Sequence, residues 1–162
     1  MSKSYSAGPA SSSRRLWLGG AALLGIALAL GSRRGGARAA DAAPIVQPET
    51  PGPRAFMDRA FDLMRRAEAA GDQPYGAVVV RDGRIVGEAA SAVNRPDPTA
   101  HAEIEAIRDA ARRLGRRDLT GGILYSSSRP CPMCEAAAYW AGIGRMIHGA
   151  DVLEAGAPRL RR

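Results

Sequence analysis

The sequence predicts an α/β fold in which helices pack against a β-sheet. Segments with helical periodicity alternate with short apolar, β-branched segments in the order α-β-β-α-β-α-β. The chain has 162 residues, of which 46% are hydrophobic, and this content suits one domain with one core. Its two cysteines are too few for a disulfide-rich scaffold.

The first predicted elements are a helix over 54–70 and a β-hairpin. Apolar residues in 54–70 recur at the spacing of one helix face, and Gly71 is a typical helix stop. Residues 75–80 are apolar and rich in valine, which predicts a strand. The pair Asp82-Gly83 then favours a tight primed turn into a second strand at 85–86.

The second half of the domain begins after a loop at 94–98, where two prolines exclude regular structure. We expect the next helix to run to Leu114, with Thr99 as its cap and Gly115 as its terminator. The remaining predicted elements are a strand at 123–127, a helix at 131–141 and a last strand at 146–149.

The net charge of +7 is distributed unevenly along the chain. Residues 1–39 hold six basic side chains and no acidic one, which leaves 17 basic and 16 acidic side chains in 40–162. A body so close to neutral lacks the field that attracts phosphates, so we expect no nucleic-acid partner.

Residues 1–39 are typical of an export signal. A basic pair, Arg14-Arg15, precedes an apolar run over 16–31, which is shorter than the ~20 residues of a spanning helix. Ala37-Arg38-Ala39 and Ala40-Asp41-Ala42 both fit a small-x-small cleavage site. The alternative is an uncleaved membrane anchor.

The paired arginines, followed by an aromatic residue and leucine, resemble a twin-arginine signal. The resemblance implies a signal at 1–39, a linker at 40–53 and a folded domain at 54–162. It also implies the twin-arginine translocase as a partner during export, and a periplasmic or extracellular location.

Two short segments carry the chemistry: His101-Ala102-Glu103 and Pro130-Cys131-Pro132-Met133-Cys134. One imidazole and two thiolates leave tetrahedral zinc an open position for a water whose pKa falls towards ~7. The cysteines are spaced i, i+3 at a helix start, so they face one way, and the helix dipole favours their thiolate forms. Taken alone, the two cysteines could also be a redox pair or half of a structural zinc site. The His-x-Glu segment, taken alone, could be a helix cap with a salt bridge.

Together, the two segments match the zinc-deaminase signature, in which the glutamate is not a ligand. We expect Glu103 to take a proton from the water and deliver it to the ring nitrogen and then to the departing ammonia. The second histidine, His148, has no acidic or cysteine neighbour in sequence, so we interpret it as structural.

The resemblance to the cytidine/deoxycytidylate deaminase superfamily extends over residues 54 to about 150. It is carried by 74–78, 97–103, 124–127 and the cysteine helix, whose run into Ala138-Tyr139-Trp140-Ala141 is most similar to bacterial guanine deaminases and nucleoside deaminases. It implies an α-β-α sandwich, a mixed sheet with helices on both faces, here shortened after the last predicted strand. A homodimer is a further implication.

The same resemblance implies the roles of individual residues. One zinc per chain is held by His101, Cys131 and Cys134, Glu103 moves the proton, and Asn94 hydrogen-bonds the substrate base. Two positions depart from the family: Asn94 lies only seven residues before His101, and Arg129 stands where relatives usually carry glutamate.

These observations predict hydrolytic deamination of a free purine base or nucleoside, with guanine to xanthine and ammonia as the lead reaction. A cytosine- or cytidine-type substrate and tRNA adenosine are the enzymatic alternatives. A zinc-stabilised binding domain without catalysis is the alternative from another class.

Overall fold

The computed structural model describes residues 43–160. Five strands in this range form one mixed sheet with the strand order β2-β1-β3-β4-β5. Strands β3 and β4 are parallel, and the other neighbouring pairs are antiparallel. The strands are β1 (Gly76–Arg81), β2 (Arg84–Ala90), β3 (Ile123–Ser126), β4 (Arg145–His148) and β5 (Leu153–Gly156).

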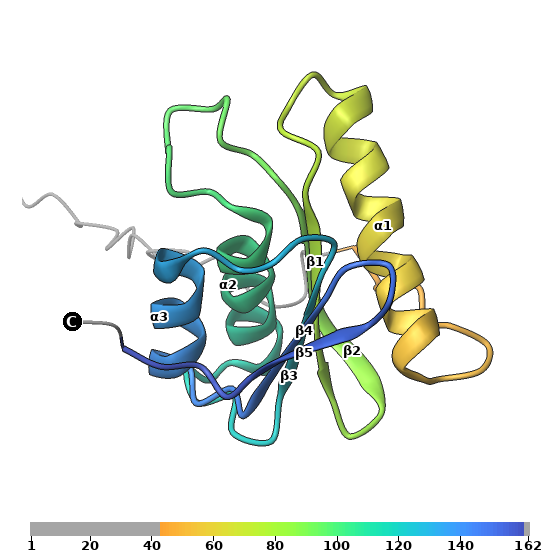
Figure 1. Cartoon of the computed structure of the whole chain (residues 1–162), viewed down its shortest axis with the longest axis vertical. Coiled ribbons are helices and arrows are strands. Elements are labelled where there is room, and N and C mark those ends of the chain that lie inside the picture. The colour runs from red at the N-terminus through yellow and green to blue at the C-terminus, as the bar shows by residue number, and fades with distance from the viewer. Residues whose placement is uncertain (1–42, 161–162) are drawn as a thin grey trace, which may run out of the picture. The chain divides into compact units, whose positions relative to one another are not determined.

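Three helices cover the sheet from both sides: α1 (Pro53–Ala69), α2 (Ala102–Leu114) and α3 (Pro132–Trp140). Helix α1 lies on one face, and α2 and α3 lie together on the other (Figure 1). Alternate residues of β1 serve the two cores, since Val78 packs with the α1 side and Val79 with the α2 and α3 side. The predicted α-β-α sandwich is confirmed.

Two glycines let the helices approach the sheet closely on opposite faces. A Cβ at Gly76 would lie 2.2 Å from the Ala60 carbonyl oxygen of α1. A Cβ at Gly87 would lie 2.4 Å from the Ala110 nitrogen of α2. Both contacts are with backbone, so no side-chain movement relieves them. The distance of each helix from the sheet therefore depends on a missing side chain.

Helix α2 begins later than the sequence predicts. Its N-cap is His101, not Thr99. Thr99 instead donates both its backbone N–H and its hydroxyl to Asp97, at 2.8 and 2.6 Å. Because this local turn uses the side chain of Thr99, the prediction that Thr99 caps the helix was wrong.

The strand β5 was not predicted. Its residues pair antiparallel with β4, as Ile147 with Glu154 and His148 with Leu153. Arg145 and Glu154 add an ion pair of 2.6 Å between the two strands. The strand at 146–149 therefore does not end the sheet, and β5 covers the edge that β4 would expose.

The segment 43–50, predicted to be linker, contacts the folded domain. The side-chain amide of Gln47 donates to the Ile85 carbonyl at 2.8 Å and accepts from the Ile85 N–H at 2.9 Å. Ile45 is half-buried against the α1 side of the core. Gln47 thereby occupies two backbone groups on the outer edge of β2, as a neighbouring strand would.

No helix within residues 43–160 has both the length and the apolar character to cross a membrane. The predicted signal at 1–39 and both predicted cleavage positions lie outside the described residues.

Candidate metal centre and substrate pocket

His101 is placed by the start of α2. It is the N-cap residue, with extended backbone angles of φ −62° and ψ 147°, and its carbonyl accepts the Glu105 N–H at 2.9 Å. Its side chain makes no capping hydrogen bond, so the imidazole is available as a ligand.

The two cysteines are placed in the same way by α3. Cys131 is the N-cap, Pro132 follows in the first turn, and Cys134 is fully buried one turn further on. Neither helix uses its N-cap side chain as a cap. Two helix starts therefore converge on one point, as the sequence predicts.

The three side chains have the separations of ligands to one metal ion. The Nδ1 atom of His101 lies 3.8 Å from Sγ of Cys131 and 3.5 Å from Sγ of Cys134, and the two sulfurs are 3.6 Å apart. Zinc bonds of about 2.0–2.3 Å in a tetrahedron separate the ligand atoms by about 3.5–3.8 Å. The residues fit zinc, and they are positioned to bind a metal ion as predicted.

Glu103 lies beside these ligands, in the first turn of α2. Its side chain is buried, and its Oε1 accepts the hydroxyl of Ser126 from β3 at 2.9 Å. Its Oε2 lies 3.5 Å from Sγ of Cys134. The carboxylate is thus held between the sheet and the metal ligands.

Burial raises the pKa of the Cys134 thiol well above its usual value, with the nearby Glu103 carboxylate as the next cause. The sequence predicted the opposite direction, from the position of the cysteines at a helix start. At Cys134 burial and the neighbouring carboxylate of Glu103 oppose the thiolate, and the sulfur gives up its proton on binding a metal.

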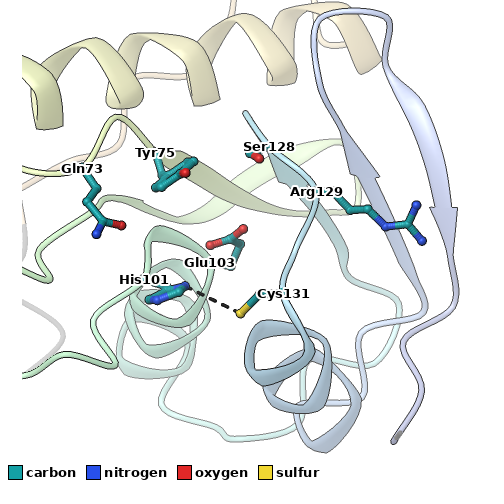
Figure 2. A pocket seen from close by; sticks show the side chains of 7 residues that line it. All are labelled: Gln73, Tyr75, His101, Glu103, Ser128, Arg129 and Cys131. Carbon is teal, nitrogen blue, oxygen red and sulfur yellow. Dashed lines mark hydrogen bonds between the residues drawn. The ribbon is translucent and has the colours of Figure 1, made fainter.

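A pocket opens over the metal centre, and Figure 2 shows the side chains that surround it. The α1–β1 loop supplies one side, α2 the base, and the β3–α3 loop the other side. The lining residues are Gln73, Tyr75, His101, Glu103, Ser128, Arg129 and Cys131. The guanidinium of Arg129 points away from Glu103 and from Cys131 (Figure 2).

Asn94 is not among the residues that line this pocket. Its side-chain amide donates to the Gly71 carbonyl at 2.7 Å, and its backbone N–H donates to Asp72 at 3.1 Å. In this structure Asn94 braces the loop before α2, and its contact with a substrate base stays a prediction.

His148 ends β4 and is half-buried. Burial, followed by the charge of Arg129, lowers its pKa below the usual value. His148 is not one of the three grouped ligand residues found within 43–160.

Sequence reasoning missed Gln73, Tyr75 and Ser128 as lining residues. All three lie in loops: Tyr75 is within the segment 74–78 that carries the family resemblance, and Gln73 and Ser128 are adjacent to 74–78 and 124–127. Their adjacency to those segments was the one signal available in the sequence.

Comparison with known proteins gives consistent results. The family profile described as "Cytidine and deoxycytidylate deaminase zinc-binding region" matches residues 52–150. A guanine deaminase from Bacillus subtilis (strain 168) is 45% identical over 106 residues, which is 62% of this chain and 68% of that protein. A tRNA-specific adenosine deaminase from Haemophilus influenzae is 41% identical over 104 residues, which is 63% of this chain and 60% of that protein.

Solved structures agree with these relatives. The structure of the B. subtilis guanine deaminase superposes with a TM-score of 0.56 at 45% identity, covering 59% of this chain and 62% of that one. A structure from a study of tRNA:A34 deaminases superposes with a TM-score of 0.57 at 41% identity, covering 58% of this chain and 69% of that one. The matched region thus spans roughly three-fifths to two-thirds of each relative's length.

Proposed function

This chain belongs to the cytidine and deoxycytidylate deaminase family, and on that premise we propose that it deaminates a free purine base or nucleoside, with guanine as the lead substrate. In the proposed reaction, water adds its oxygen to the ring carbon that bears the amino group. The carbon–nitrogen bond then breaks, and the amine leaves as ammonia. Guanine and water give xanthine and ammonia, with no redox change.

Zinc held by His101, Cys131 and Cys134 supplies Lewis acidity, which lowers the pKa of a water molecule to about 7. The side chains of the protein transfer the protons and orient the groups that do so. Glu103 accepts one proton of the attacking water and passes it to the ring nitrogen, and it then takes the second proton from the added hydroxyl and donates it to the leaving amine. The Ser126 hydroxyl donates to one oxygen of Glu103 and so orients its carboxylate.

The observation that carries this proposal is the position of Glu103. Glu103 is a buried carboxylate that lines the pocket and lies 3.5 Å from a metal-ligand sulfur. Its burial lowers the free energy of unfolding, because a charged group loses its hydration. A purely structural zinc site has no use for this carboxylate. Its position therefore favours catalysis over a zinc-stabilised binding domain.

Two further observations bear on the choice of substrate, and the second favours a free base. The relatives include a guanine deaminase and tRNA-specific adenosine deaminases at similar identity, so the family match does not separate a free base from tRNA. The nearly balanced charge of residues 40–162 favours the free base, since a tRNA-binding groove needs an excess of basic side chains.

The test is an ammonia-release assay with the zinc-loaded protein. The substrates are guanine, adenine, cytosine, their nucleosides, and a tRNA anticodon stem-loop that carries adenosine. We expect turnover of guanine or guanosine above all others. Turnover of the stem-loop alone would establish the tRNA alternative, and bound zinc without any turnover would establish the binding domain.

We also propose that the protein is exported by the twin-arginine route. That route carries folded proteins, so zinc can occupy the thiolates before the chain meets an oxidising compartment. The support is the sequence of residues 1–39 together with a metal site that contains two free cysteines.

A further inference from the structure

The loop between α1 and β1 holds Gln73 in a fixed backbone position. The Gln73 N–H donates to Oδ1 of Asp72 at 2.8 Å, and the Gln73 carbonyl accepts the Tyr75 N–H at 2.8 Å. Pro74 lies between Gln73 and Tyr75, and its ring fixes its own φ angle. The backbone of Gln73 is therefore restrained on both sides.

Asp72 joins this loop to the loop that leads into α2. Besides Gln73, its carboxylate accepts the Ser91 hydroxyl at 2.9 Å and the backbone N–H groups of Val93 and Asn94 at 3.2 and 3.1 Å. One carboxylate thus receives four hydrogen bonds from two loops. The loops that carry Gln73 and precede His101 are held as a unit.

The side-chain amide of Gln73 is available to a ligand. Gln73 lines the pocket together with His101 and Glu103, and Figure 2 shows it across the pocket from Cys131. No hydrogen bond of this amide to any residue in 43–160 is found. The amide of Asn94, in contrast, is engaged by the Gly71 carbonyl at 2.7 Å.

We propose that Gln73 determines specificity by hydrogen-bonding the polar edge of the heterocyclic base. This inference rests on the proposed deaminase function. A carboxamide offers one acceptor oxygen and two donors, and it pairs with a base edge that presents an acceptor beside a donor. The carbonyl O6 and the N1–H of guanine form such an edge, and Tyr75 supplies an aromatic wall to the same pocket.

The first experiment compares Gln73→Leu with Gln47→Leu in the zinc-loaded protein. The side chain of Gln73 is exposed in the protein without substrate, and we expect Gln73→Leu to lower kcat/KM for the best base about 10-fold, because the base edge then lacks its hydrogen-bond partner. Zinc content and Tm should stay at wild-type values. Gln47→Leu, which removes two hydrogen bonds to Ile85 outside the pocket, should lower Tm and leave the preference among bases unchanged. Normal kcat/KM in Gln73→Leu would overturn the proposal.

The second experiment uses a readout that a structural role would not change. Guanine and 2-aminopurine carry the same 2-amino group, but 2-aminopurine has neither the O6 carbonyl nor the N1–H, so only its N1 acceptor is left to pair with Gln73. We expect Gln73→Leu to lose about 5- to 10-fold more activity on guanine than on 2-aminopurine, because it removes two hydrogen bonds from guanine and one from 2-aminopurine. Equal losses on both bases would contradict the assignment.

A binding measurement separates this inference from the proposed function. Zinc-loaded Glu103→Gln protein, with and without Gln73→Leu, is titrated with guanine by calorimetry. If the wild type turns over no base but Gln73→Leu weakens guanine binding at least 10-fold, the reaction is wrong and the role of Gln73 stands. If guanine binds equally well in both proteins, or does not bind at all, the role of Gln73 is overturned.

Discussion

Glu103 is held by two side chains that constrain its carboxylate from either side. Ser126 donates to one oxygen, and the Cys134 sulfur lies beside the other. This position makes Glu103 the group on which the proposed reaction depends. It also separates the role of the carboxylate from metal binding, because the three ligand atoms belong to other residues.

We therefore expect Glu103→Gln to retain one zinc per chain and to lose turnover by about 10²–10⁴-fold. Metal analysis and ammonia release on the same sample measure the two effects. The matched control is Glu105→Gln, two residues along α2, whose carboxylate pairs with Arg108 at 2.6 Å outside the pocket. Near-normal turnover in Glu103→Gln would refute the assigned proton path.

Asp72 gives a prediction on pH. Burial acts to raise its pKa, but hydrogen bonds from Asn94, Ser91, Gln73 and Val93 together outweigh burial and lower it. A carboxyl group with a lowered folded-state pKa contributes stability that is present above its unfolded value of about 3.9. That contribution is lost as the pH falls through the folded-state pKa.

Asp72→Asn should accordingly lower the Tm at pH 7, and the difference from wild type should narrow below about pH 4. Thermal unfolding of both proteins between pH 3 and pH 7 measures this. A difference that widens towards acid pH would show that the ionised form of Asp72 is not the stabilising one.

At the scale of elements, the distance between each helix and the sheet is set by backbone contact. The close approach at Gly87 involves two backbone atoms of α2, the Ala110 nitrogen at 2.4 Å and the Ala106 oxygen at 2.5 Å. The helix that carries His101 and Glu103 is thus located by a strand residue with no side chain. A displacement of α2 moves both groups relative to the cysteines of α3.

We expect Gly87→Ala to destabilise the domain by about 1–3 kcal/mol, because the added methyl group has no space between β2 and α2. Zinc affinity should fall with stability. The control is Gly144→Ala, where a Cβ would meet nothing within 4 Å. Denaturant unfolding compares the two, and equal free energies of unfolding would show that α2 shifts at no cost.

The elements with strong local signals were predictable. The Asp82-Gly83 turn gives Asp82 a φ of 51° and Gly83 a φ of 70°, as a primed hairpin turn requires. The strand β5 has four residues, two of them exposed, and its last residue is a glycine. It is stabilised by pairing with β4, and such pairing leaves no periodic pattern in the sequence.

The candidate site also contains residues that the sequence predicts and residues that it does not. The metal ligands were predictable because each is fixed by a helix start and a short spacing. Gln73 was not, because its place in the pocket depends on Asp72 joining two loops that lie 18 or more residues apart in sequence. No local pattern encodes that contact.

At the scale of the whole molecule, the proposed export signal and the metal site lead to one joint prediction. Replacement of Arg14-Arg15 by Lys-Lys should hold the precursor inside the cell in a folded, zinc-loaded form. The matched control is Arg33-Arg34→Lys-Lys, which changes a second arginine pair in the same leader. Cell fractionation with immunoblotting measures export, and equal export of both variants would exclude the twin-arginine route.

If residues 1–39 are an export signal, as proposed, the contact of Gln47 with Ile85 limits how much of the chain a signal peptidase can remove without uncovering β2. Processing after Ala39 or Ala42 leaves Gln47 in the mature protein. A cut after Gln47 would remove its two hydrogen bonds to Ile85 and expose the outer edge of β2. The bare strand would then offer its free N–H and C=O groups to other molecules, which is a route to aggregation. Under the export proposal, cleavage is therefore compatible with the fold only at positions before Gln47, whose contact covers the edge of β2.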